Sequence, residues 1–387
     1  MQPFTFIVAG AGMIGLATAI GLQQAGHRVI VIERGERPEY GSAPELRVSA
    51  LAHSSRHLLE RLGSWQQMPA SRLGPYTGMR VWDYDSFGRI EFDASELALA
   101  DIGAIVENKV LEQVLWDQAV AAGVSIMATT ELVQQQVDDQ RVQVTLANGQ
   151  TLTGDYLIAA DGARSTVRAQ ANLPLTFWDY QQQAQVAVLT TELPHQGIAR
   201  QVFLPTGPLA LLPLADAHQV SIVWSADTER AQQLSTLSDS DFIRQLRVAS
   251  DNCLGLLQLK SARATFPLRM QYCQRWVQQR LLVLGDAAHS IHPLAGQGAN
   301  LGFADVADLL AIFAHPELQV ATLPKQLRQW ERQRKAAAVT MIGAMESFKR
   351  GFAGSAPWAK LGRGLALQLA HRVTPLKQQL MRAALGA

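Results

Sequence analysis

"IVAGAGMIGLATAIGLQQAGHRVIVIER", residues 7–34, is the stretch that decides the fold. Counting His27 as neutral, it carries no charge before Arg28. Its ends predict buried strands over 4–9 and 28–33, and the segment between them predicts a helix over 13–25 that stops at Gly26. Strand, helix and strand in this order make a compact βαβ unit, so the sequence predicts an α/β fold.

Two other interpretations of this apolar stretch do not fit. A secretory signal begins with basic residues, and residues 1–6 contain no Lys or Arg. A membrane-spanning helix needs about 20 apolar residues in one run. Here three glycines crowd the middle of the stretch, and Gln23 and Gln24 lie near its end. The stretch is therefore interpreted as part of a nucleotide-binding fold.

Gly10, Gly12 and Gly15 fit the pattern GxGxxG between a strand and a helix. The first glycine permits a tight turn, the second lets the backbone approach a pyrophosphate, and the third lets helix and strand pack closely. Glu33 follows about 20 residues on, where an acid accepts hydrogen bonds from a ribose. Glycines needed only for packing are the less favoured alternative. The unit by itself does not separate NAD from FAD.

Composition excludes several classes. The chain has 387 residues, of which 48% are hydrophobic and 17% charged, and this is typical of a globular protein of one large or two ordinary domains. A net charge of +1 gives no overall attraction to nucleic acid. The two cysteines, Cys253 and Cys273, form no CxxC pair and no metal-binding spacing. We therefore expect no metal site and a reducing, cytoplasmic compartment.

Farther along the chain, alternating runs predict an antiparallel sheet inserted into the nucleotide-binding fold. Asn148-Gly149 marks a hairpin turn inside one such region. Long helices are predicted over 297–313 and 323–350. The predicted division is nucleotide-binding parts at 1–75, 101–180 and 273–350, substrate-domain parts at 76–100 and 181–272, and basic amphipathic C-terminal helices at 351–387.

Two later stretches decide the cofactor. In "YLIAADGARSTVR", residues 156–168, a strand runs into Asp161-Gly162. In "RLLVLGDAAHSIHPLAGQGANLGFADVADL", residues 280–309, a strand ends at Gly285-Asp286, and a glycine-rich turn at 296–298 opens a helix. With the first glycine turn, these stretches resemble the single-component, class A flavoprotein aromatic hydroxylases over nearly the whole chain. The resemblance implies a Rossmann-like FAD-binding domain, with FAD as cofactor and NAD(P)H as electron donor.

The resemblance also implies roles for individual residues. Asp286 would hydrogen-bond the ribityl chain of FAD, Arg47 would lie near the phosphates or the flavin, and Asp161 near both FAD and the nicotinamide donor. Asn108 stands beside the ribityl chain, where many relatives have Arg or Gln. The segment 293–300 would lie along the flavin ring, with its helix N-terminus stabilising negative charge there. The predicted cofactor-binding set is Gly10, Gly12, Gly15, Glu33, Arg34, Arg47, Asn108, Asp161, Asp286, Pro293, Gly296, Gln297, Gly298, Ala299 and Asn300.

Within that class, "LRVSALAHSSRHLLERLGSW" (46–65) and "GAIVENKVLEQVLW" (103–116) are similar to the ubiquinone-biosynthesis hydroxylases. "GMRVWDYDSFGRIEFD" (78–93), "LTFWDYQQQA" (175–184) and "ARQVF" (199–203) look closest to the branch that hydroxylates 2-polyprenylphenols at ring position 6. The resemblance implies an oxidoreductase, a flavoprotein monooxygenase that hydroxylates the polyprenylphenol ring with O2 through a C4a-hydroperoxyflavin. The open alternatives are a sibling hydroxylase acting at a later ring position, one acting on a small soluble phenol, and a flavin-binding scaffold without turnover.

The reacting groups and the lipid contacts are predicted more coarsely. His292 and Pro293 are the catalytic candidates beside the flavin turn, and His289 is expected to bond backbone groups there. Val202, Phe203, Leu211 and Leu212 are predicted to cover a lipid-phenol pocket, with core packing as an equal alternative.

The tail, residues 357–387, contains five cations and no acid, which favours a membrane surface or a quinone-synthesis assembly as partner. A helical pair packed on the core is the equal alternative. We expect a protein that is peripheral on the inner face of the cytoplasmic membrane. The five cations are Lys360, Arg363, Arg372, Lys377 and Arg382.

Overall fold

The computed structural model describes residues 3–290, 297–315, 318–353, 364 and 377. Its first layer is a six-stranded sheet in the order β19-β20-β12-β1-β2-β8, with every neighbouring pair parallel except β19 and β20. Because β2 lies on one side of β1 and β12 on the other, the strand order reverses at β1, and α/β sheets bind ligands at such a point. The strands are β1 (Thr5–Ala9), β2 (Arg28–Ile32), β8 (Ser125–Met127), β12 (Tyr156–Ala159), β19 (Val277–Gln278) and β20 (Leu281–Val283).

The predicted βαβ unit is present at the centre of this layer. Helix α1 (Met13–Gln24) connects β1 to β2 and packs against α3 (Asn108–Ala121) and α7 (Gln297–Phe313). Every residue from Gly15 to Leu22 is buried. A helix covered on several sides has no face that must be polar, and this explains why the stretch carries no charge.

The second layer is a nine-stranded sheet in the order β21-β18-β13-β16-β15-β14-β5-β6, with β17 paired to β13. All neighbouring pairs are antiparallel except β14 and β5. The predicted inserted sheet is therefore present, with one parallel pair where two segments far apart in the chain meet. The strands are β5 (Gly78–Asp83), β6 (Arg89–Asp93), β13 (Leu175–Thr191), β14 (Ile198–Leu204), β15 (Gly207–Pro213), β16 (Gln219–Asp227), β17 (Leu257–Leu259), β18 (Ala264–Cys273) and β21 (His289–Ser290).

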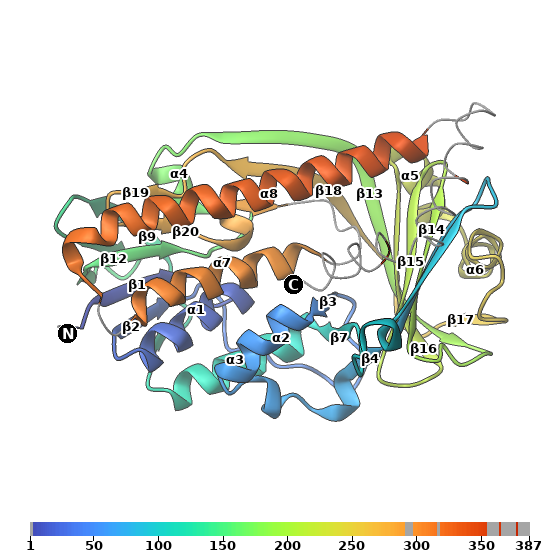
Figure 1. The fold of residues 1–387 in the computed structure, drawn as a ribbon, viewed down its shortest axis with the longest axis horizontal. Coiled ribbons are helices and arrows are strands. Elements are labelled where there is room, and N and C mark those ends of the chain that lie inside the picture. Colours follow the sequence, from blue (N-terminus) through green and yellow to red (C-terminus); the bar gives the residue numbers. More distant parts are fainter. Residues whose placement is uncertain (1–2, 291–296, 316–317, 354–363, 365–376, 378–387) are drawn as a thin grey trace.

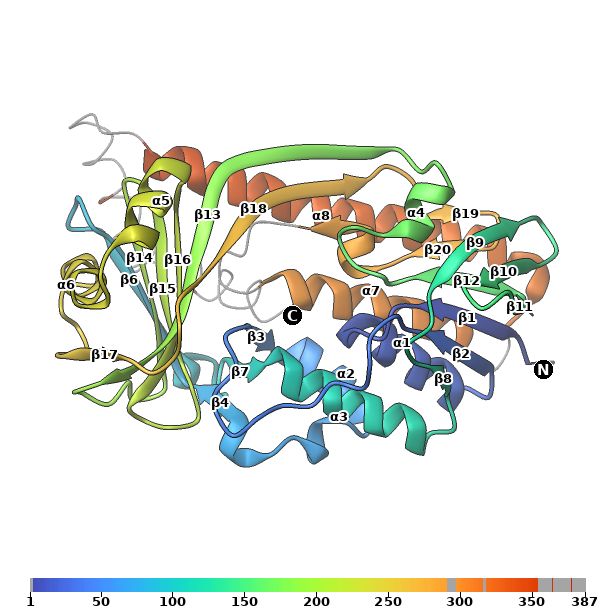
Figure 2. The ribbon, with the colours of Figure 1, turned by 180° about the vertical axis from the view of Figure 1, so that it is seen from behind.

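Strands β13 and β18 form a long ribbon that reaches from this sheet back to the first layer (Figures 1 and 2). Helix α8 (Leu323–Ala353) runs alongside the ribbon, and its Ile342 packs against Tyr180, Leu268 and Met270. β13 begins at Leu175 and so crosses the predicted boundary between 180 and 181. The ribbon thus belongs to both layers, and no single sequence position separates them.

The two faces of the nine-stranded sheet have different neighbours. Helices α5 (Thr228–Thr236) and α6 (Asp239–Ala249) cover one face, where Phe242 and Leu246 are fully buried. The other face turns toward a small sheet of order β3-β7-β4, where Val188 and Leu212 pack with Ala50 and Ile105. The strands of that sheet are β3 (Val48–Ala52), β4 (Leu73–Tyr76) and β7 (Gly103–Glu107).

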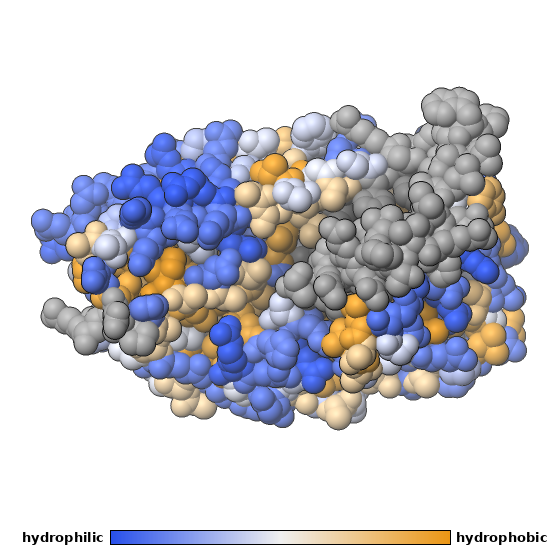
Figure 3. Space-filling view, viewed as in Figure 1, coloured by the Kyte–Doolittle hydropathy of each residue, from blue (hydrophilic) through white to orange (hydrophobic). Residues whose placement is uncertain are grey.

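The remaining elements complete the first layer. These are α2 (His53–Arg61), α4 (Thr166–Gln170) and a three-stranded sheet of β9 (Leu132–Val137), β10 (Val142–Leu146) and β11 (Thr151–Gly154). Gly149, between β10 and β11, has a φ of 84°, as the predicted hairpin turn requires. The surface over the first half of α8 is largely hydrophilic (Figure 3). Within the described residues, no helix is both long and apolar enough to cross a bilayer.

Candidate functional site

The glycine turn after β1 forms a cradle open to solvent. Gly10 has a φ of 101°, and a Cβ there would lie 2.5 Å from the carbonyl oxygen of Ala160. A Cβ on Gly15 would overlap the carbonyl oxygen of Gly10, so this glycine is required for packing. A Cβ on Gly12 would meet no atom within 4 Å. Gly12 is also the N-cap of α1, so no side chain at this position caps the first N–H groups of the helix.

Glu33 follows directly on β2 and lies beside this cradle. Its Oε2 accepts the N–H of Ala11 at 2.7 Å, and its Oε1 accepts the N–H of Gly35 at 2.7 Å. Each carboxylate oxygen accepts more than one hydrogen bond, so both oxygens keep capacity for a ribose hydroxyl. Arg34 is exposed next to it. The sequence therefore placed the acid correctly at the edge of the glycine turn.

Asp161 belongs to the loop after β12, which packs directly on Gly10. Its Oδ2 accepts the N–H of Thr166 at 2.8 Å and so caps helix α4. Its Oδ1 is buried and has no hydrogen-bond partner within the described residues. Gly162 has a φ of 81°, and a Cβ there would meet open space. An unsatisfied buried acceptor beside an open cradle is the kind of group that a bound ligand completes.

Asp286 lies in the short 3-10 turn Gly285–Ala287 that follows β20. It is exposed on the outer side of the turn. Protein atoms crowded around its carboxyl raise its pKa, while the charges of His289 and Arg47 act in the opposite direction. Arg47 is itself exposed, and its guanidinium carbon lies 6.0 Å from the ring centre of Phe266 on β18. Arg47 thus bridges the two layers next to Asp286.

At the start of α7 (Gln297–Phe313), the side chain of Asn300 is bound by other parts of the chain. Asn300 is buried, its Oδ1 accepts the N–H of Ala52 at 2.9 Å and the hydroxyl of Ser55 at 2.7 Å, and its Nδ2 donates to the carbonyl of Ala50 at 2.8 Å. The Asn300 side chain therefore fixes α7 to β3 and α2, and both its amide oxygen and its amide nitrogen have partners in the protein.

The two residues before Asn300 differ in their surroundings within the described part of the chain. Ala299 packs partly buried on the core, and Gly298 faces open space. The predicted residues His292, Pro293 and Gly296 lie outside the described residues, as does the side chain of Gln297.

Asn108 opens α3, and its side chain points back to β3. Its Oδ1 accepts the hydroxyl of Ser49 at 2.8 Å, and its N–H donates to the carbonyl of Arg47 at 3.0 Å. Its carbonyl oxygen is thus already engaged, and the amide NH2 is the group that remains for a cofactor.

The predicted lipid-contact residues divide between the two faces of the sheet. Val202 and Leu211 are 0% and 1% exposed in the cluster under α5 and α6, so their assignment to a pocket was wrong and core packing is correct. Phe203 and Leu212 lie on the face that α5 and α6 do not cover. Phe203 packs there with Val81 and Ile90, and Leu212 packs near the small β3-β7-β4 sheet. Successive residues of a strand alternate between faces, so neighbours such as Val202 and Phe203 cannot share one pocket.

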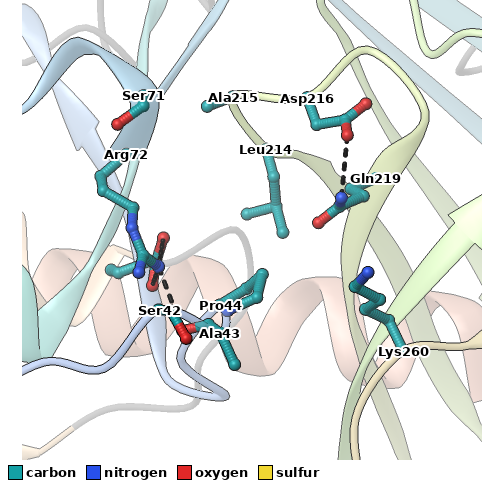
Figure 4. A pocket seen from close by; sticks show the side chains of 11 residues that line it. Ser42, Ala43, Pro44, Ser71, Arg72, Leu214, Ala215, Asp216, Gln219 and Lys260 are labelled. Atoms are coloured by element: carbon teal, nitrogen blue, oxygen red, sulfur yellow. Dashed lines mark hydrogen bonds and ion pairs between the residues drawn. The ribbon is translucent and has the colours of Figure 1, made fainter.

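A cavity of about 450 Å³ lies between the loop 42–44, the 3-10 turn at 70–72 and the hairpin that joins β15 to β16 (Figure 4). Arg72 on its wall is paired with Glu107 at 2.9 Å, and Gln219 donates to Asp216 at 2.8 Å. Lys260 points in from the far side. None of the predicted cofactor or lipid-contact residues lines this cavity.

Arg168, which the sequence analysis did not single out, joins two of the loops. It is buried, donates to the carbonyl of Ala287 at 2.6 Å, and donates to the carbonyl of Ala163 at 2.9 Å. It therefore holds the Asp161 loop against the Asp286 turn. Its signal in the sequence was an arginine on a short helix next to a glycine-bearing loop.

The tail predictions are mostly untested. Of the five cations in 357–387, only Lys377 lies within the described residues. It is buried, and its Nζ lies 2.6 Å from Oε1 of Glu96. This particular cation is therefore occupied by a carboxylate of the same chain.

Taken together, the geometry fits FAD. Gly12 and the uncapped start of α1 offer N–H groups and open space to a pyrophosphate. Glu33 can accept hydrogen bonds from a ribose, the buried Oδ1 of Asp161 lacks a donor within the described residues, and the Asp286 side chain is exposed beyond the carboxyl end of β20. A site of this kind, between a Rossmann-like sheet and a second large sheet, defines an FAD-dependent flavoprotein.

Comparison with known proteins gives the family. Residues 4–344 match the family described as FAD binding domain. The 3-demethoxyubiquinol 3-hydroxylase of Escherichia coli (strain K12) is 35% identical over 392 residues, covering 100% of this chain and 99% of that protein. The ubiquinone biosynthesis monooxygenase COQ6 of Danio rerio is 32% identical over 431 residues, covering 98% and 89%. The chain belongs to the FAD-dependent monooxygenase family of the ubiquinone-biosynthesis hydroxylases.

Solved structures support the fold. The p-nitrophenol 4-monooxygenase PnpA of Pseudomonas putida superposes with a TM-score of 0.79 at 18% identity, over 100% of this chain and 99% of that one. A probable FAD-dependent monooxygenase of Pseudomonas aeruginosa, pqsL, gives 0.79 at 19% identity, over 94% and 99%. Both confirm the α/β arrangement with its second sheet.

Proposed function

We propose that this enzyme hydroxylates the aromatic ring of a polyprenylated intermediate in ubiquinone synthesis, with NAD(P)H as electron donor and O2 as co-substrate. The observation that carries the proposal is the 35% sequence identity to the 3-demethoxyubiquinol 3-hydroxylase, which extends over 100% of this chain and 99% of that protein. The same identity favours a late, already methoxylated ring as substrate. The stretches at 78–93, 175–184 and 199–203 are the argument for an earlier 2-polyprenylphenol substrate, which is the second candidate.

The flavin supplies the redox chemistry: bound FAD would take a hydride from the nicotinamide and, once reduced, would activate O2 for transfer of one oxygen atom to an electron-rich ring. The residues of this chain would bind and orient. Gly12 and the start of α1 would hold the pyrophosphate, and Asp286 would fix the flavin half. The face of the nine-stranded sheet opposite α5 and α6 would cover the ring and exclude water.

Part of that face is apolar, and this suits a prenylated ring. Leu212 and Val188 lie there, and Phe203 with Val81 and Ile90 forms an adjoining apolar cluster. We place the prenyl chain against this cluster. Association with a membrane surface through 357–387 remains part of the proposal, and it depends on cations other than Lys377 because that residue is paired with Glu96.

The test is to delete the gene in its host and identify the quinone precursor that accumulates. Accumulation of a demethoxy precursor supports a late ring as the substrate. Accumulation of a 2-polyprenylphenol supports the second candidate. Normal ubiquinone with no precursor would refute both. The purified enzyme provides a second measurement, because NAD(P)H oxidation that is stimulated by substrate and coupled to product separates a hydroxylase from a flavin-binding scaffold.

A further inference from the structure

One buried carboxylate holds both ends of the turn that carries Asp286. Asp305, in the middle of α7, is 0% exposed. Its Oδ2 accepts the N–H of Gly285 at 3.2 Å and faces Nε2 of His289 at 2.6 Å. Gly285 and His289 stand immediately before and just after the segment 286–288. The turn is therefore attached at two points to a single atom of a rigid helix.

The other oxygen of this carboxylate is bound from α8. The Nε of Arg334 donates to Oδ1 of Asp305 at 2.8 Å, and the same guanidinium donates to the carbonyl of Leu301 at 3.2 Å. The indole of Trp330 donates to the backbone carbonyl of Asp305 at 3.2 Å. A buried charge is tolerable when it is both paired and hydrogen-bonded, and Asp305 meets both conditions.

In the part of the chain that the structure describes, one hydrogen bond fixes the ring of His289. The residue is 1% exposed, and the ring stacks on Trp276 with centres 5.1 Å apart and planes at 30°. An ionised carboxylate only accepts, so Nε2 carries the hydrogen that points to Asp305. Nδ1 is buried and has no partner within the described residues. Within the described residues, the His289 side chain thus bonds a carboxylate and not the backbone groups that were expected.

We propose that Asp305 and His289 are positioning residues for the flavin. They fix the 285–289 turn so that the Asp286 carboxylate is already in place when FAD arrives, and Arg334 fixes Asp305 from α8. A turn held at both ends loses little freedom on binding, so releasing one end makes FAD binding less favourable. The sequence signal was an acid at 305 between apolar positions of a predicted helix, such as Phe303 and Val306, which are buried.

The experiment uses two substitutions at one position. His289→Gln keeps an N–H that can reach Asp305, and His289→Leu removes it at similar size. The apoprotein is titrated with FAD, and the dissociation constant, the visible spectrum and the midpoint potential of the bound flavin are measured. We expect His289→Leu to raise the dissociation constant about 10- to 100-fold, by analogy with residues that orient the ligands of a metal ion. We expect His289→Gln to stay within about threefold of wild type.

Asp308→Asn is the matched control, because Asp308 contacts the same guanidinium at 3.4 Å but its side chain is 51% exposed and does not touch the turn. It should bind FAD as wild type does, whereas Asp305→Asn should behave like His289→Leu. If His289→Leu lowers the apoprotein melting temperature yet leaves the FAD dissociation constant, spectrum and potential unchanged, the network is only structural and the proposal is overturned. If His289→Leu does not fold, the FAD dissociation constants of Asp305→Asn and Asp308→Asn are compared. A higher constant for Asp305→Asn supports the proposal, and equal constants overturn it. No aromatic substrate is needed, so the outcome does not depend on which ring is hydroxylated.

Discussion

Replacing Gly12 with Val should separate folding from flavin binding. The backbone at Gly12 has φ −75° and ψ 178°, an extended conformation that valine adopts readily. A Cβ added there meets no atom within 4 Å, so no core packing is disturbed. The expected cost to folding is that of a poorer N-cap residue, about 1 kcal/mol. The apoprotein should therefore remain folded.

The cost to FAD binding is larger. The isopropyl group would occupy the space through which the first N–H groups of α1 approach a pyrophosphate. Loss of two hydrogen bonds to a charged group, at about 1.5 kcal/mol each, removes about 3 kcal/mol of binding free energy. At about 1.4 kcal/mol for each factor of ten, the dissociation constant should rise more than about 100-fold.

The assay is purification of the variant, measurement of bound flavin, and titration of the apoprotein with FAD, with a thermal melt recorded without FAD. Gly343→Val is the control, because Gly343 lies exposed on α8 and a Cβ there also meets nothing within 4 Å. It should keep full flavin occupancy. Full flavin occupancy in Gly12→Val as well would refute this account of the cradle.

Three further predictions follow from the same geometry. Gly15→Ala should destabilise the apoprotein by about 1–3 kcal/mol, since its Cβ would overlap the Gly10 carbonyl oxygen, and an unchanged urea midpoint would contradict this. Desolvation by the protein atoms around the Asp286 carboxyl raises its pKa, so the folded apoprotein binds this proton more tightly than the unfolded chain does. The stability of the apoprotein therefore falls as pH rises from about 4 through the folded pKa. The melting temperature of Asp286→Asn should therefore exceed that of wild type above this pH window and equal it below about pH 4. The variant should nevertheless bind FAD more weakly. Equal melting temperatures at every pH would count against this prediction. Phe203→Ala should raise the KM for a prenylated substrate while Val202→Ala lowers only the melting temperature, and equal KM effects from the two neighbours would remove the prenyl contact from the Phe203 cluster.

Much of the site could be predicted because its signals are local. A glycine that must turn, a glycine that must leave room and an acid at the end of the next strand follow one another within a single βαβ unit. Short-range backbone geometry imposes these residues, and Gly10, Gly12, Gly15 and Glu33 lie where the pattern indicates. Asp161 and Asp286 also follow buried parallel strands of the same sheet, so both lie at the carboxyl end of that sheet.

Other parts of the site depend on contacts between distant segments. Alternation along β14 shows that Val202 and Phe203 point to opposite faces, but it does not say that α5 and α6 cover the face of Val202. Similarly, an asparagine at the start of a helix looks the same in sequence whether it binds a cofactor or, like Asn300, the backbone of β3.

By itself, then, the sequence determined the Rossmann-like unit, the second sheet and the position of the flavin cradle, because each rests on a pattern of near neighbours. Only the tertiary structure decided which strand residues lie under α5 and α6 and which side chains hold the Asp286 turn. Asp305 binds His289 and Arg334, which stand 16 and 29 residues away. The free energy of a buried hydrogen bond depends on where two segments come to rest, and no local pattern encodes that.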